Sequence, residues 1–193
     1  MAAPLWARCG KQPQRAESLS VRVIGLDPGL RLTGYACVGL HEGAERLEEA
    51  GVLRLKRGDG SPQGLADRLV ELEADLRDLI ERLEPQAACV EAVFAHKAFP
   101  GTAIAMGHAR GVILLTVRRA GLPIVELSPA VVKRSMTGFG RATKDQMRLA
   151  VQARYGLAAP PTPADVADAI AIAAGGLLRH THESRIGPVG KLP

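Results

Sequence analysis

The chain has 193 residues, 47% of them hydrophobic, which is enough for one folded domain with a buried core. Lys and Arg total 25 against 20 for Asp and Glu, and this net charge of +5 suits a polyanionic partner without requiring one. The cysteines Cys9, Cys37 and Cys89 form no close pair. This excludes a disulfide framework and a cysteine zinc site, and is typical of a reduced, cytoplasmic protein. No apolar run is long enough to span a bilayer, so we expect no membrane association.

The first half of the chain predicts a three-stranded antiparallel meander followed by a helix. Short β-branched or alternating runs, separated by Gly, Asp and Pro, are typical of strands joined by tight turns. Leucines at spacings of three and four then predict an amphipathic helix that Pro85 ends. We expect strands at 21–29, 32–40 and 46–58 and a helix at 61–85, after a disordered basic leader at 1–20.

The second half alternates strands with helices and ends in three helices. The last helix has a well-marked start, with Thr162 as the N-cap and Pro163 in the first helical position. The order predicts an α/β fold with a mixed five-stranded sheet and helices on both faces, in one domain at 21–180 with a flexible tail at 181–193. We expect strands at 86–94 and 122–129 and helices at 99–121, 130–138, 144–156 and 162–180.

Two acids occupy unusual places in predicted strands. Asp27 ends the apolar strand VIGLD, although an Asp before Pro-Gly is also a common turn residue. Glu91 interrupts ACVEAVF, a strand that we expect to be covered on both faces. A buried carboxylate without a partner is costly, and no Lys or Arg adjoins Glu91 in sequence. We therefore favour a functional role for Glu91. For Asp27, a functional residue and a turn residue remain equal alternatives.

Two further acids begin the last helix. Asp165, taken alone, is explained by its place in the first helical turn, where an acid stabilises the helix dipole. Asp168 lies in a stretch that is apolar nearly all round, which indicates a buried helix. The two acids share one helix face, so their charges repel unless a cation lies between them.

Together these four carboxylates indicate a site for hard cations. Converging oxygen ligands without a His or Cys cluster suit Mg²⁺, and Mn²⁺ as its substitute. Two such ions roughly 3.5–4 Å apart are a common device for phosphodiester hydrolysis. The predicted catalytic and metal-binding residues are Asp27, Glu91, Asp165 and Asp168.

Five sequence segments, in order, resemble the motifs of RuvC-type Holliday-junction resolvases. They are GLDPGLRLTGYACV, VEAVFAHK, MGHARGVILL, LSPAVVKRSMTGFGRATKDQM and DVADAIAIA, and the match covers roughly residues 21–180. The resemblance implies an RNase H-like fold and places the four acids at the family's metal-binding carboxylates. It also implies a homodimer that nicks two strands of a four-way junction symmetrically, and a hexameric branch-migration motor as a partner. The segments AFPGTAI and MGHARG depart from the usual pattern and put details of junction contact in doubt.

Aromatic and basic residues near two loops are candidates for DNA contact. By resemblance, Phe94 matches a residue that wedges at the junction, and Lys133 and Lys144 match lysines needed for cleavage. For Phe99 and Phe139 we favour packing in the core over base stacking. The basic residues that flank the glycine-rich loop predict phosphate contacts, with a solvated basic patch as the alternative: Lys133, Arg134, Arg141 and Lys144.

Two rival functions share some of these features. An actin-like ATPase or sugar kinase has a similar first hairpin, but such chains need two domains to enclose a nucleotide. A junction-binding scaffold without activity would gain nothing from acids placed against phosphate.

One helix also carries a stripe of small residues. Ala103, Gly107 and Gly111 recur at steps of four on one face of the helix predicted at 99–121. Glycine inside a helix costs about 1 kcal/mol relative to alanine, so the stripe indicates a close backbone approach. The neighbour is either the chain's own sheet or the same helix of a second chain, and we favour the second chain.

Overall fold

The computed structural model describes residues 21–55, 61–92 and 100–186. Five strands form one mixed sheet in the order β3-β2-β1-β4-β5. The first three strands are an antiparallel meander, and β4 and β5 continue the sheet parallel to β1. The predicted sheet is therefore confirmed. The strands are β1 (Val21–Asp27), β2 (Leu32–His41), β3 (Ala44–Arg54), β4 (Ala87–Glu91) and β5 (Ile124–Leu127).

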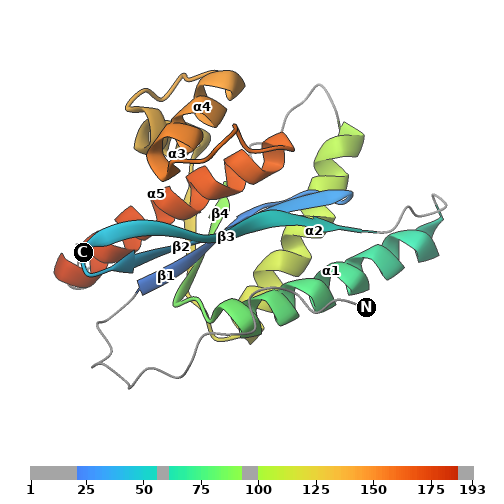
Figure 1. Cartoon of the computed structure of the whole chain (residues 1–193). Coiled ribbons are helices and arrows are strands. Elements are labelled where there is room, and N and C mark those ends of the chain that lie inside the picture. The colour runs from blue at the N-terminus through green and yellow to red at the C-terminus, as the bar shows by residue number, and fades with distance from the viewer. Residues whose placement is uncertain (1–20, 56–60, 93–99, 187–193) are drawn as a thin grey trace, which may run out of the picture.

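Helices cover both faces of this sheet (Figure 1). On one face lie α1 (Pro62–Leu83) and α2 (Pro100–Arg119), which pack against each other and bury the leucine stripe of α1. On the other face lies α5 (Ala164–Ile186), which carries α3 (Pro129–Thr137) and α4 (Lys144–Tyr155) on its outer side. No helix in the described ranges combines the length and apolar character needed to cross a membrane.

The central strands have no solvated face. Val23 of β1 and Cys89 of β4 pack toward α5, whereas the next residues, Ile24 and Val90, pack toward α1 and α2. This two-sided burial explains the near-continuous apolar runs of these strands. Cys37 and Cys89 are buried free thiols.

Side chains cap the starts of α1 and α4, whereas α5 does not begin where its sequence signal predicts. Ser61 caps α1 by accepting from the backbone N–H of Gly64 at 3.0 Å, and Thr143 caps α4 in a capping box. In α5 the first helical residue is Ala164, so Pro163 precedes the helix instead of opening it. The helix also runs to Ile186, past the predicted end at 180, because the polar residues after 180 tolerate helix and the next Gly-Pro begins only at 187.

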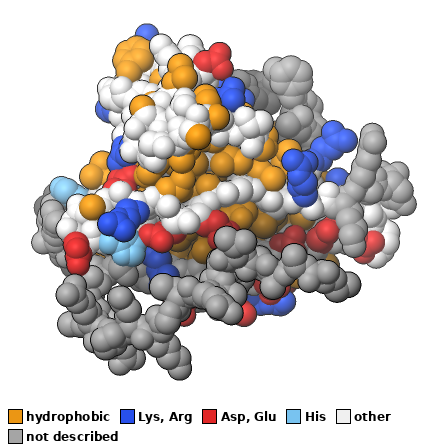
Figure 2. Space-filling model, viewed as in Figure 1, with side chains coloured by type: hydrophobic (Ala, Val, Ile, Leu, Met, Phe, Trp, Pro, Cys, Tyr) orange, Lys and Arg blue, Asp and Glu red, His pale blue; other side chains and the backbone are white. Residues whose placement is uncertain are grey.

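The pair α3–α4 forms a lobe that is tied back to the sheet. Arg154, near the end of α4, donates to Glu45 of β3 at 2.6 Å and to the backbone oxygen of Ser135 in α3 at 3.0 Å. The hydroxyl of Tyr155 donates to the same Glu45. Figure 2 shows this lobe above the sheet, with hydrophobic side chains gathered at its base. The ties fix the lobe and, with it, the basic residues of α3 and α4.

Candidate active site

Strand register and close packing bring the four predicted carboxylates together. In the parallel pair β1–β4, Leu26 is paired with Val90, so Asp27 and Glu91 are the next residues on adjoining strands. Helix α5 then supplies Asp165 and Asp168.

The approach of α5 depends on two glycines in the sheet. A Cβ atom on Gly25 of β1 would lie 2.4 Å from the backbone oxygen of Ala169, and one on Gly34 of β2 would lie 2.2 Å from that of Asp165. No side chain fits at such distances, so α5 rests directly on the backbone of β1 and β2. This contact sets its two acids beside the end of β1.

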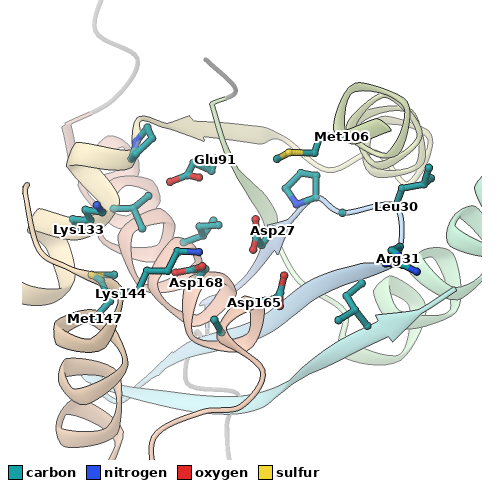
Figure 3. Close-up of a pocket in the computed structure, with 17 residues that line it drawn as sticks. Asp27, Leu30, Arg31, Glu91, Met106, Lys133, Lys144, Met147, Asp165 and Asp168 are labelled. Carbon is teal, nitrogen blue, oxygen red and sulfur yellow. The ribbon is translucent and has the colours of Figure 1, made fainter. Parts of the chain in front are cut away.

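The four carboxylates line one pocket of about 820 Å³ (Figure 3). Their oxygen atoms point into the pocket from β1, β4 and the first turns of α5, and Lys144 lies beside Asp168. In the described ranges, no ion pair engages any of the four acids. The alternatives of a plain turn residue at Asp27 and a plain helix cap at Asp165 do not account for this convergence.

Burial and mutual repulsion disfavour the ionised form of these acids. The pKa of Asp27 is raised to about 7, first by burial and then by the charges of Asp168, Asp165 and Glu91, while Lys144 lowers it. Burial also raises the pKa of Glu91, as does the charge of Asp168, and Lys133 lowers it. The pKa of Asp168 is raised by burial and by Asp165 against the opposing effect of Lys144 and Lys133. A group of like charges held in this way binds a cation readily.

The raised pKa of Asp27 predicts that Asp27→Asn stabilises the metal-free protein at alkaline pH. The folded state holds the proton up to about pH 7, whereas an unfolded aspartate loses it near its ordinary value of 3.8. The free energy of unfolding of the native protein therefore falls as the pH rises between these values, and the full penalty is present above pH 7. Urea unfolding in EDTA should show the variant more stable at pH 8, on the order of a few kcal/mol, and equal to the native protein near pH 4.

Asp78→Asn is the matched control, because Asp78 lies on α1 with its side chain 73% exposed. It should change the stability little at either pH. A gain for Asp27→Asn of the same size at pH 4 and pH 8 would contradict the assigned titration.

The donor set fits a divalent cation that few protein ligands hold. Within the described ranges, no three His, Cys, Asp or Glu side chains are close enough to hold one ion among themselves. Mg²⁺ is usually held by one or two carboxylates, with water and substrate phosphate completing its shell, and it does not need an all-protein cage. Pairs of acids across this pocket meet that requirement.

The structure separates the predicted basic residues into two groups. Lys133 of α3 and Lys144 of α4 line the same pocket as the acids. Arg134 and Arg141 are exposed and do not line it. Phe94, Phe99 and the other residues of 93–99 lie outside the described residues, so the wedge role of Phe94 stays a prediction.

Three contributors to the site were missed at the level of sequence. Arg31, in the β1–β2 turn, and Met106 of α2 line the pocket. Arg110 of α2 donates to the backbone oxygen of Glu91 at 2.6 Å and to the carboxylate of Glu126 at 2.6 Å, which fixes the end of β4. Arg31 follows Asp27 closely enough that its place could have been inferred. No local signal marks Met106 or Arg110, because only packing of α2 beside β4 and β5 brings them to the site.

Known proteins share both this sequence and this fold. The family model for the crossover junction endodeoxyribonuclease RuvC matches residues 23–175. The RuvC of Synechococcus sp. (strain CC9311) is 38% identical over 166 residues, 83% of this chain and 100% of that protein. The RuvC of Moorella thermoacetica is 42% identical over 151 residues, 78% of this chain and 87% of that protein.

Solved structures agree with the family match. The Thermus thermophilus RuvC in complex with a Holliday junction substrate has a TM-score of 0.72 at 30% identity, over 86% of this chain and 96% of that one. The yeast mitochondrial Holliday junction resolvase Ydc2, at 14% identity and a TM-score of 0.59 over 86% of this chain and 84% of that one, shares the fold. The RNase H-like fold implied by the sequence motifs is confirmed. The chain therefore belongs to the RuvC family of crossover junction endodeoxyribonucleases.

Proposed function

We propose that this chain resolves four-way DNA junctions by metal-dependent hydrolysis of phosphodiester bonds, with a nick in each of two strands. The observation that carries the proposal is the convergence of four acids from β1, β4 and α5 in one open pocket, where no described ion pair neutralises them. Repulsion among them is relieved by cations, and their oxygen atoms suit Mg²⁺, or Mn²⁺ in its place.

The chain's own residues would divide the work as follows. Two Mg²⁺ ions would be held by the four carboxylates of the pocket: Asp27, Glu91, Asp165 and Asp168. Bound there, the ions would supply an activated water and charge for the leaving oxygen. Lys133 and Lys144, which line the same pocket, would hold the phosphates beside the scissile bond. The raised pKa values describe the metal-free acids, which lose their protons when a cation binds.

Further partners rest on the family resemblance. A homodimer would give the two active sites that paired nicks require, and a hexameric branch-migration motor would feed the junction to them. Phe94 would wedge at the branch point, and Arg134 and Arg141 would contact phosphates outside the pocket. A cytoplasmic location also stays a prediction.

The test is incubation with a synthetic mobile four-way junction and with linear duplex, in Mg²⁺, Mn²⁺ or EDTA, with products mapped on denaturing gels. We expect cuts in the junction at symmetric positions on two strands of like polarity, and none in EDTA. Junction binding without cutting would favour an inactive scaffold, and turnover of ATP would favour the kinase-like alternative. Either result would overturn the proposal.

Lys144→Ala should weaken junction binding in a salt-dependent way. If the ammonium contacts one phosphate, its loss lowers the slope of log affinity against log salt by about one unit. Fluorescence anisotropy between roughly 50 and 200 mM salt measures this slope. Arg119→Ala is the control, because Arg119 is exposed at the end of α2 farthest from the pocket. Equal slopes for Lys144→Ala and the native protein would make Lys144 a solvated surface residue.

A further inference from the structure

The turn between α3 and α4 presents an aromatic ring to solvent. Phe139 is 61% exposed, so its predicted packing in the core is wrong. The chain has only three phenylalanines, and burying such a ring would contribute about 1.5–3 kcal/mol to stability. An exposed ring in so aromatic-poor a chain is therefore a candidate contact for a partner.

The backbone under this ring is held on both sides. Gly138 ends α3 in the left-handed region, at a φ of 75°, and its N–H donates to the oxygen of Arg134 at 2.8 Å. The hydroxyl of Thr137 accepts from the N–H of Phe139 at 3.1 Å. On the far side, the N–H of buried Ala142 donates to the oxygen of Phe139 at 3.3 Å. A ring on a fixed backbone loses little entropy on binding.

The same turn lies at the rim of the carboxylate pocket. A Cβ atom on Gly140 would lie 3.2 Å from the backbone oxygen of Ala130, so the turn folds back over the first turn of α3. Ala130 follows Pro129, which lines the pocket, and the turn leads directly to Lys144, which also lines it. Phe139 is therefore held between two pocket-lining segments.

Positive charge flanks the ring on this rim. Arg134 and Arg141 are exposed on either side of it in sequence, and the guanidinium of Arg134 lies 3.7 Å from the position of a Cβ on Gly140. Cations beside an exposed aromatic ring are the arrangement that binds unpaired bases, because the ring stacks on a base and the cations hold its phosphates. Bases inside a duplex arm are not available for stacking, whereas those at a branch point are.

We propose that Phe139 stacks on a base at the branch point of the junction, while Arg134 and Arg141 hold the phosphates beside it. The inference rests on the proposed function, since it takes the junction as the substrate. It adds a second aromatic contact to the one predicted at Phe94.

The test compares Phe139→Ala, Phe139→Leu and Phe139→Trp on a four-way junction and on linear duplex of the same sequence. Leu149→Ala is the matched control, because Leu149 is 57% exposed on α4. We expect the Ala and Leu variants to bind the junction about 5- to 150-fold more weakly, the range that one stacked base gives, with duplex affinity unchanged. The Trp variant and the control should bind as the native protein does.

A fluorescent base analogue, 2-aminopurine, at the branch point gives a readout of stacking itself. The native protein and Phe139→Trp should quench it, and Phe139→Leu should not. Native affinity in Phe139→Leu, or equal losses on junction and duplex, would overturn the stacking role while leaving the proposed function intact. A native protein that neither binds nor cuts the junction would instead overturn the proposed function and the inference with it.

Discussion

Asp168→Asn is expected to lower the rate of junction cleavage by about three orders of magnitude while leaving junction affinity equal or higher. Asp168 points into the pocket from a buried turn of α5, where its repulsion with the other acids calls for a cation. A metal contributes several kcal/mol of transition-state charge stabilisation, and each 1.36 kcal/mol is a factor of ten in rate. Removing the acid also removes a negative charge that faces phosphate, so binding does not suffer.

Asp27→Asn and Glu91→Gln should behave in the same way, because both acids share the pocket with Asp168. Asp165→Asn should also slow cutting, because Asp165 lines the same pocket. Single-turnover cleavage and anisotropy on the same junction separate rate from affinity. Asp78→Asn, remote from the pocket on α1, should cut at the native rate. If Asp27→Asn, Glu91→Gln or Asp168→Asn cut the junction at the native rate, the substituted residue would not belong to the catalytic site.

Local signals were enough to predict the order and type of the elements. The leucine spacing that predicted α1 and the Pro85 that follows its end lie within one short stretch of chain, so both can be recognised without knowledge of the fold. The apolar run of β4 predicted a strand covered on both faces, which the structure confirms. The end of α5 was misplaced because a polar segment after His180 looks like a tail in sequence, although nothing in it breaks a helix.

Residues of the site stood out individually where an acid conflicted with its own surroundings, and the family motifs were needed to add Asp27, Asp165, Lys133 and Lys144. Glu91 and Asp168 stood out as charges inside apolar runs, and the structure places both in the pocket. Arg110 gave no such signal, since an Arg on a helix is ordinary until its hydrogen bond to the end of β4 is seen. Phe139 was misjudged for the opposite reason: aromatic rings are usually buried, and only the fold shows that this one is not.

The two glycines of the small-residue stripe on α2 face open space within the described part of the chain, so the chain's own sheet is not their neighbour. Cβ atoms on Gly107 and Gly111 would meet no atom of the described residues within 4 Å, and both glycines are exposed. Ile104 and Leu115, on the same helix face, are 61% and 50% exposed, while the opposite face packs against the core. An uncovered apolar and small-residue face suits the two-fold packing of α2 on its copy in a second chain.

Gly107→Leu is therefore expected to give a folded monomer that cuts junctions with single, unpaired nicks. The new side chain enters open space within one chain and replaces a glycine that costs the helix about 1 kcal/mol, so folding should not weaken. Against a second α2 the same side chain would hold the two backbones apart and break the dimer. Light scattering measures the oligomeric state, and thermal unfolding measures the stability of the fold. A nicking assay on a circular plasmid with an extruded cruciform shows how the junction is cut, since paired nicks linearise the plasmid and single nicks relax it.

Ala153→Leu, an exposed position on α4, controls for an added surface leucine and should remain dimeric. A Gly107→Leu protein that stays dimeric and linearises the plasmid would place the dimer contact on another surface, and one that fails to fold would mean that the stripe packs within the chain.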